Sequence, residues 1–132
     1  MSDARGQANQ PDDLTQLLAA GASRSTLRIT TRGRKTGKRH SVPIWFVVDG
    51  PRIVFGTLNP ERDWVRNAKR DPQVELEIGD LHLTGRFSVV TEPRRTSEIG
   101  RLIAGKYWLA WLASWFGFAS REMFEVDSLT RI

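Results

Sequence analysis

The sequence SVPIWFVVDGPRIVFGT, residues 41–57, predicts two β-strands joined by a tight turn. Residues 41–48 and 52–57 are rich in β-branched and aromatic side chains, which favour strands. Asp49-Gly50-Pro51 between them is a typical turn sequence. This stretch therefore predicts a β-hairpin, and it makes an antiparallel sheet the expected centre of the fold.

Three further segments alternate between apolar and polar residues with the period of two that a half-buried strand shows. They are residues 25–31, 73–78 and 81–90, and Gly85 is expected to bend the longest strand. A last strand is expected around residues 123–126. Because hairpins dominate this order, the sequence predicts a mainly antiparallel sheet whose five or six strands close into a small barrel.

Three helices are expected to flank the strands. The first covers residues 14–18, where three leucines share one face. The second starts at Asn59-Pro60, because Asn caps helices and Pro fits the first helical position, and it stops at Asp71-Pro72. The third opens at residues 91–93 and continues through the aromatic run 107–118.

The length of 132 residues fits one domain that buries roughly two-thirds of its unfolded surface. Residues 1–12 are polar, so we expect a disordered leader there, followed by a single domain over residues 13–132 with a C-terminal Trp-rich helix. The lack of cysteine excludes disulfides, thiolate metal sites and cysteine nucleophiles. No stretch reaches the ~18 apolar residues of a membrane span, so we expect a cytoplasmic protein, at most peripherally bound to a membrane.

The chain carries a formal charge of +5, and it has no acidic residue between Asp13 and Asp49. The cations of this stretch are densest in residues 32–40, which join two expected strands. Gly33 and Gly37 let the backbone approach a ligand closely, and the arginines and lysines can donate charge-assisted hydrogen bonds. The spacing matches neither a P-loop nor a Rossmann turn. The loop is either a solvated turn or, as its glycines favour, a binding loop for a phosphate or another oxyanion.

A second cationic cluster lies on one side of the expected second helix and consists of Arg62, Arg66, Lys69 and Arg70. Arg62 is the better placed for an anion because it lies near the helix N-terminus, whereas Lys69 and Arg70 are expected to be solvated. His40 and His82 have no metal-ligand spacing, so no metal site is expected. No arrangement of Ser, His and Asp supports hydrolysis.

The aromatic run near the C-terminus is unusual for so small a protein. Trp108, Trp111 and Trp115 fall on one face of a helix. This face packs on the barrel or on a second subunit, lines a pocket for a flat aromatic ligand, or lies at a membrane interface. Tyr107 is the only tyrosine and is a candidate proton donor to a reduced substrate.

Two motifs resemble the deazaflavin-dependent nitroreductase family, whose members are split-barrel flavin or deazaflavin oxidoreductases. The first, within residues 30–47, contains TTRGRKTG and HSVPIWFV. The second, within residues 64–74, contains WVRN and DPQV. A third, weaker motif is AGKYW at residues 104–108, and the resemblance extends over about residues 25–126.

The resemblance implies a six-stranded antiparallel split β-barrel with flanking helices. It also implies a bound coenzyme F-420, a deazaflavin hydride carrier with a phosphate and an oligoglutamate tail. The phosphate and tail are assigned to the loop residues Arg34, Lys35, Thr36 and Gly37, with Lys38 and His40 as neighbours. Trp64 is placed near the tail, and the ring system is placed beside Pro43, Trp45, Gly56, Thr57 and Leu58.

The implied activity is hydride transfer from the reduced coenzyme to an electron-poor acceptor, a quinone or a nitro compound, with Tyr107 or water supplying the proton. Family members are usually dimers, so the resemblance implies a homodimer with the Trp-rich helix at its interface. A relative that uses FMN is the first alternative. The second, a single-strand nucleic-acid binder, is disfavoured because the tryptophans cluster on a terminal helix and not on the sheet faces, so no nucleic-acid partner is expected.

Overall fold

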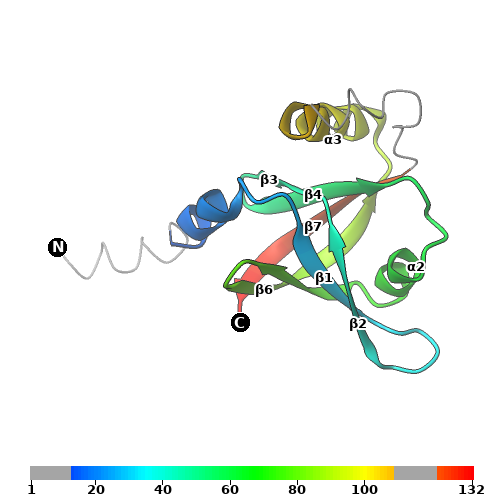
Figure 1. The fold of residues 1–132 in the computed structure, drawn as a ribbon. Helices are drawn as coiled ribbons and strands as arrows, with labels where there is room; N and C mark the ends of the chain where they lie inside the picture. Colours follow the sequence, from blue (N-terminus) through cyan, green and yellow to red (C-terminus); the bar gives the residue numbers. More distant parts are fainter. Residues whose placement is uncertain (1–12, 109–121) are drawn as a thin grey trace.

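The computed structural model of the protein describes residues 13–108 and 122–132. Within them, seven strands form one antiparallel sheet with the order β2-β1-β5-β6-β7-β4-β3. The strands are β1 (Leu27–Arg32), β2 (Arg39–Ile44), β3 (Val47–Asp49), β4 (Arg52–Thr57), β5 (Gln73–Ile78), β6 (Leu81–Val90) and β7 (Glu122–Arg131). The helical segments are residues 13–21, α2 (Asp63–Arg70) and α3 (Pro93–Lys106). Figure 1 shows the sheet curled on itself, with α3 lying across the side of β3 and β4.

β2 and β3 lie at the two ends of the strand order, yet only Trp45 and Phe46 separate them in sequence. We call these two residues the crossover. β2 pairs with β1 and β3 pairs with β4, so the chain changes partner at the crossover and links the two edges of the sheet. The single strand predicted over residues 41–48 is therefore wrong, and seven strands replace the expected six. The reason is geometric, because a strand of a small barrel must bend where it leaves one partner for another.

The other strand predictions are confirmed. β1 buries every second residue, as the alternation predicted. The hairpin of β3 and β4 forms, and Gly50 in its turn has a φ of 61°, which glycine adopts without steric cost. The pairing of β6 with β7 shifts register between Thr84 and Arg86, so the predicted bend lies beside Gly85. β7 is the predicted last strand and is longer than expected.

Two helix boundaries near the crossover differ from the prediction. α2 begins at Asp63 and not at Asn59-Pro60, because the Asn59 side chain accepts a hydrogen bond from the backbone N of Glu61 (3.0 Å) and closes a turn. α3 ends at Lys106, and Tyr107 is its C-cap with a φ of −112° and a ψ of 33°. The continuous helix predicted through the aromatic run is therefore wrong at this point.

Part of the aromatic run, residues 109–118, lies outside the described residues, as does the leader predicted over residues 1–12. The proposed face of tryptophans, with its subunit or membrane contact, stays a prediction. No helix within residues 13–108 and 122–132 has the length and apolar character needed to cross a membrane.

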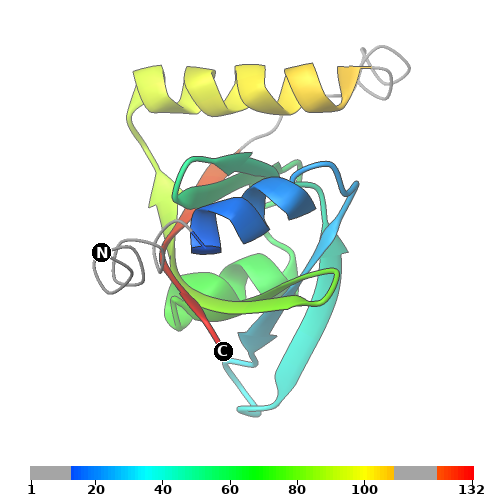
Figure 2. The same cartoon turned by 90° about the vertical axis from the view of Figure 1, so that its left-hand side faces the viewer.

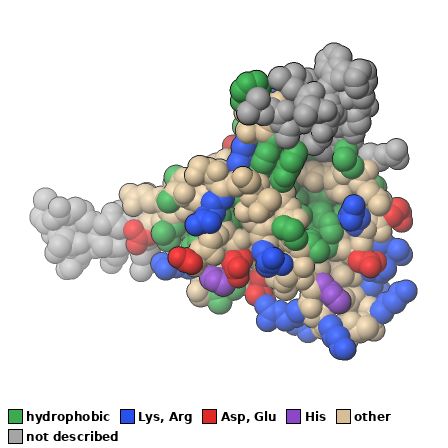
Figure 3. Space-filling model, viewed as in Figure 1, with side chains coloured by type: hydrophobic (Ala, Val, Ile, Leu, Met, Phe, Trp, Pro, Cys, Tyr) green, Lys and Arg blue, Asp and Glu red, His purple; other side chains and the backbone are tan. Residues whose placement is uncertain are grey.

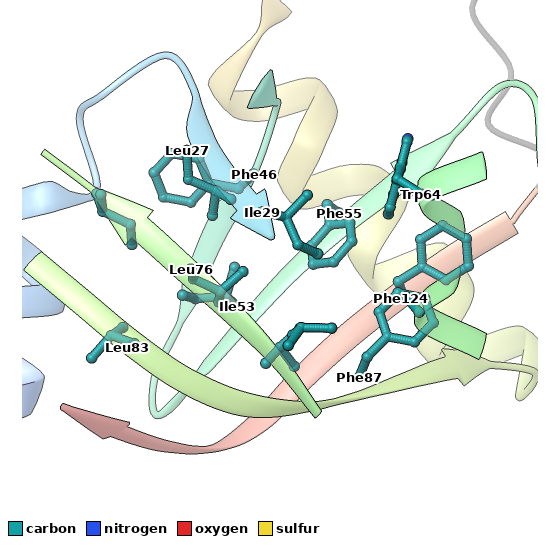
Figure 4. Packing of buried hydrophobic residues seen from close by; sticks show 14 of the residues in the cluster. Leu27, Ile29, Phe46, Ile53, Phe55, Trp64, Leu76, Leu83, Phe87 and Phe124 are labelled. Carbon is teal, nitrogen blue, oxygen red and sulfur yellow. The ribbon is translucent and has the colours of Figure 1, made fainter. Parts of the chain in front are cut away.

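The curled sheet encloses a hydrophobic core, part of which Figure 4 shows. Phe55, Trp64, Phe87 and Phe124 pack with ring centroids 4.9–6.1 Å apart. Trp64 belongs to α2, so this packing fixes the first turn of α2 against the barrel. A second, smaller cluster joins α3 to β3, β4 and β7, and Figure 2 shows α3 on one side of the barrel, apart from the other helices.

Candidate functional site

A cavity of about 450 Å³ lies between the β1–β2 loop and α2, and we call it the anion cavity. The loop lines it with Gly33, Arg34, Lys35 and Thr36. β2 adds His40, Ser41 and Val42. α2 adds Asp63, Trp64 and Asn67. Figure 3 shows Lys and Arg side chains gathered at the end of the molecule where Figure 1 draws the β1–β2 hairpin, so cations surround a cavity that also holds hydroxyl donors.

The loop of the anion cavity is closed by its own backbone. The N–H of Gly33 donates to the carbonyl of Lys38 (2.6 Å), and the N–H of Gly37 donates to the carbonyl of Gly33 (2.8 Å). Gly37 has a φ of 73°, a left-handed conformation that favours glycine. The Thr36 hydroxyl accepts from the backbone N of Lys38 (3.2 Å). Gly37 and Lys38 therefore shape the turn, and neither lines the cavity.

Asn67 anchors this loop to α2. Its side chain is buried, with 3% exposed, and its Oδ1 accepts hydrogen bonds from the backbone N of Arg34 (3.2 Å) and from Arg34 Nη1 (2.8 Å). Arg34 Nη2 also lies 3.3 Å from the carboxylate of Asp63. The Arg34 guanidinium is thus held in one place before any ligand arrives.

A second cavity, of about 600 Å³, adjoins the anion cavity and shares Val42 and Trp64 with it. We call it the ring cavity. β2 and the crossover line it with Pro43, Ile44 and Trp45. The end of β4 and the turn after it add Gly56, Thr57, Leu58, Asn59 and Arg62. Trp45 and Leu58 are among the large apolar side chains that stay exposed, so they offer a ligand apolar surface to bury.

Ten of the twelve residues predicted to bind the coenzyme line one of these two cavities, the exceptions being the turn residues Gly37 and Lys38. Lys69 does not line either cavity; it pairs with Glu122 at 2.8 Å. The sequence analysis did not predict that Asn67 anchors the loop of the anion cavity. The signal was present, because Asn67 lies on the apolar side of α2, where a buried polar side chain needs a partner.

Tyr107 lines neither cavity. Its ring stacks on Trp45 with a centroid distance of 4.4 Å and an interplanar angle of 3°. Its hydroxyl accepts from the backbone N of Phe46 (3.0 Å) and lies 2.6 Å from the carbonyl of Ser25, to which it can donate. Burial raises the pKa of the phenol above its ordinary value, with a smaller opposing effect of the hydrogen bond to the Phe46 backbone. The role of Tyr107 as a proton donor stays a prediction.

Arg95 fastens the first turns of α3 to the sheet. Its guanidinium contacts Glu125 of β7 (2.7 Å), Asp49 of β3 (2.8 Å) and Glu98 on α3 itself (3.3 Å). The hydrogen bond to Glu125 is the main cause of the raised pKa of Arg95, and it outweighs the desolvation that lowers this pKa. α3 is therefore fixed at one end by Arg95 and reaches the crossover at the other.

Fold and site together define the class: a split-barrel protein with two adjoining cavities, one bordered by cations and the other largely apolar. The model of the F420H(2)-dependent quinone reductase family matches residues 14–107, and the chain belongs to this family. The protein is therefore an F-420-dependent oxidoreductase, and the resemblance inferred from the two motifs is confirmed.

Solved structures share the fold at low sequence identity. An F420-H2 dependent reductase (FDR-A) has a TM-score of 0.64 and 21% identity, over 79% of this chain and 95% of that chain. A chain described as a domain-swapped dimer has a TM-score of 0.66 and 20% identity, over 88% and 95%. A pyridoxamine 5'-phosphate oxidase-like protein from Listeria innocua has a TM-score of 0.57 and 13% identity, over 92% and 97%. These likenesses confirm the predicted split barrel.

Proposed function

We propose that the protein transfers electrons from reduced F-420 to a quinone, and that the coenzyme lies across both cavities. Its ring occupies the ring cavity, and its phosphate and oligoglutamate tail occupy the anion cavity. One observation carries this proposal: the cavities adjoin at Val42 and Trp64, so a ligand with a flat ring at one end and anionic groups at the other spans both. The description of the family supports the quinone as the acceptor.

The donors of the anion cavity fit a phosphate and carboxylates. Arg34 and Lys35 supply cations, Thr36 supplies a hydroxyl, and His40 supplies a ring N–H. Arg34 is held by Asn67, so its guanidinium needs little reordering when an anion binds. Lys35 is exposed and can turn toward the ligand, so Arg34 sets the position of the anion and Lys35 adds charge.

The ring cavity fits a flat conjugated ring because its walls are largely apolar. Pro43 and Trp45 lie on the crossover side, and Leu58 lies on the opposite strand end. The turn that carries Leu58 is closed by Thr57, whose hydroxyl accepts from the backbone N of Asn59 (3.1 Å). When bound, F-420 supplies the hydride chemistry, and the residues of the cavity bind the ring, orient it and keep water away from its apolar face.

Tyr107 or a water molecule supplies the proton that the reduced quinone takes up. For Tyr107 to do so, its hydroxyl must break its contact with the carbonyl of Ser25, and its raised pKa makes it a weaker acid than a free phenol. Single-turnover oxidation of reduced F-420 in the variant Tyr107→Phe tests this step. A rate equal to that of the wild type would assign the proton to water.

The test of the proposed function is a parallel titration with F-420, FMN and a single-stranded oligonucleotide, followed by tryptophan fluorescence. We expect that, of the three ligands, only F-420 binds tightly. We also expect a soluble quinone to oxidise reduced F-420 faster in the presence of the protein than without it. A nitro compound in the same assay tests the second acceptor class. Binding of FMN or the oligonucleotide in place of F-420 would overturn the proposal.

We also propose that the protein is a homodimer, which the domain-swapped dimer among the similar structures supports. Light scattering coupled to size exclusion measures the mass in solution. The expected mass is twice the chain mass of 15.0 kDa. A mass equal to one chain at micromolar concentration would refute the dimer.

A further inference from the structure

We infer that Tyr107 and Lys106 are positioning residues, which hold the crossover and through it fix the indole of Trp45 as a wall of the ring cavity. This inference rests on the proposed function, because it concerns how that cavity holds the coenzyme ring. It gives Tyr107 a role that does not depend on proton donation. It also connects the end of α3 to a cavity that α3 does not line.

The backbone of the crossover takes hydrogen bonds from α3 that the strands do not provide. The pairing of β2 ends at Ile44 and that of β3 begins at Val47, so Phe46 lies outside both ladders. Its N–H donates to the Tyr107 hydroxyl (3.0 Å), and its carbonyl accepts from Lys106 Nζ (2.8 Å). Buried backbone groups need hydrogen-bond partners. Tyr107 and Lys106, some 60 positions later in the chain, supply the partners of the Phe46 backbone.

The same two side chains also hold the surroundings of the crossover. The Tyr107 hydroxyl lies 2.6 Å from the carbonyl of Ser25, just before β1, so one hydroxyl joins three separate segments. The Lys106 ammonium lies 3.7 Å from the centroid of the buried Phe46 ring, which is the geometry of a cation–π contact. Phe46 is therefore fixed through its N–H, its carbonyl and its ring.

The stack between Tyr107 and Trp45 holds the indole of Trp45 in place as a wall of the ring cavity. One face of the indole lies flat against the tyrosine ring, and Trp45, 37% exposed, lines the cavity. An aromatic wall that is already oriented costs a ligand less entropy than one that must be ordered on binding. Removal of the stack is therefore expected to weaken binding of the ring more than binding of the tail.

The test compares Tyr107→Leu, which removes the stack and the hydroxyl, with Tyr107→Phe, which removes the hydroxyl only. Ile132, an exposed apolar residue that lines neither cavity, gives the control Ile132→Ala. Two ligands are titrated: whole F-420, and a fragment that keeps the deazaflavin ring but lacks the phosphate and tail. For the fragment we expect the Kd to rise about tenfold in Tyr107→Leu and about threefold in Tyr107→Phe, and to stay at the wild-type value in the control.

A second readout follows the crossover without any ligand. Hydrogen exchange of the Phe46 amide, measured by NMR, is expected to accelerate about tenfold in Tyr107→Phe and in Lys106→Met, because each removes a hydrogen bond to this backbone. The amide of Leu76 in the centre of the sheet is the internal control, and its exchange is expected to stay unchanged. This measurement remains informative if Tyr107→Leu fails to fold.

The outcomes separate the inference from the proposed function. If the wild type does not bind F-420, the proposed function fails. If the wild type binds F-420 but Tyr107→Leu and Tyr107→Phe bind the ring fragment as tightly as the wild type, only the inference fails. A slower single turnover in Tyr107→Phe, with fragment affinity and Phe46 exchange both unchanged, would also overturn the inference and make Tyr107 a proton donor.

Discussion

The anion cavity and the ring cavity adjoin, but they are held in place by different means. The loop of the anion cavity is closed by hydrogen bonds among residues 33–38 and is anchored by polar contacts to Asn67. The wall of the ring cavity depends on the crossover, which is held by Lys106 and Tyr107 from the end of α3. The first cavity is thus a local polar structure, and the second depends on packing between distant parts of the chain.

Because of this difference, binding of the coenzyme can be weakened in two ways, at its tail or at its ring. Changes at the anion cavity act through charge, so they should affect the phosphate and tail and leave the ring fragment bound. Changes at the crossover act through packing, so they should affect the ring. The two cavities should therefore respond separately to substitutions and to salt.

The largest effect is expected for Arg34→Ala, which removes a cation and the hydrogen bond of the guanidinium to Asn67, while the bond from the backbone N of residue 34 to Asn67 remains. We expect the Kd for F-420 to rise about a hundredfold, since charge-assisted hydrogen bonds are the strong ones. The Kd for the ring fragment should stay within about threefold of the wild type. Arg28→Ala, an exposed arginine on β1 away from both cavities, is the matched control. An equal loss of fragment binding in Arg34→Ala would show that the cavities are one unit.

A smaller effect is expected at Asn67. In Asn67→Ala the backbone N of Arg34 loses its partner, so we expect the unfolding free energy to fall by about 1–3 kcal/mol and the Kd for F-420 to rise about tenfold. In Asn67→Asp the carboxylate accepts the same bonds but offsets the charge of Arg34, so stability should recover and affinity should not. Urea unfolding and titration measure both quantities. Recovery of affinity in Asn67→Asp would contradict this account.

The same contrast explains what the sequence could predict. The alternation in β1 and the loop that joins β1 to β2 follow from local pattern, and both were predicted. The break at Trp45 and Phe46 was missed because residues 44–48 are all β-branched or aromatic and favour a strand, and the break is caused by the pairing partners β1 and β4. The contacts of Tyr107 with Ser25 and Phe46 span 82 and 61 residues, so no local pattern reports them.

Salt should distinguish the cavities further. Lys35 and Lys38 of the loop are exposed and Arg34 is partly buried, so added salt screens the attraction of these cations for phosphate and carboxylates. Between about 0.05 and 0.5 M NaCl we expect the Kd for F-420 to rise several-fold and the Kd for the ring fragment to change by less than about twofold. Isothermal titration at four salt concentrations measures both slopes. Parallel slopes for the two ligands would remove the electrostatic distinction between the cavities.

The smallest effect concerns Lys106, whose pKa burial lowers from 10.5 to about 8. Because the unfolded chain keeps this proton up to about pH 10, it binds more protons than the folded chain between pH 8 and 10, so this group makes the protein more stable as pH rises through that window. The gain should stay below about 1 kcal/mol, since Lys106 is only partly buried and solvent screens its charge. The difference in unfolding free energy between the wild type and Lys106→Met, measured at pH 7.5, 8.5 and 9.5, isolates this contribution from other titrating groups. The limit of 9.5 avoids Tyr107, whose raised pKa has the opposite effect because the unfolded phenol loses its proton first. A difference that does not change with pH would show that folding leaves the pKa of Lys106 unchanged, so that its contacts with Phe46 offset the cost of its burial.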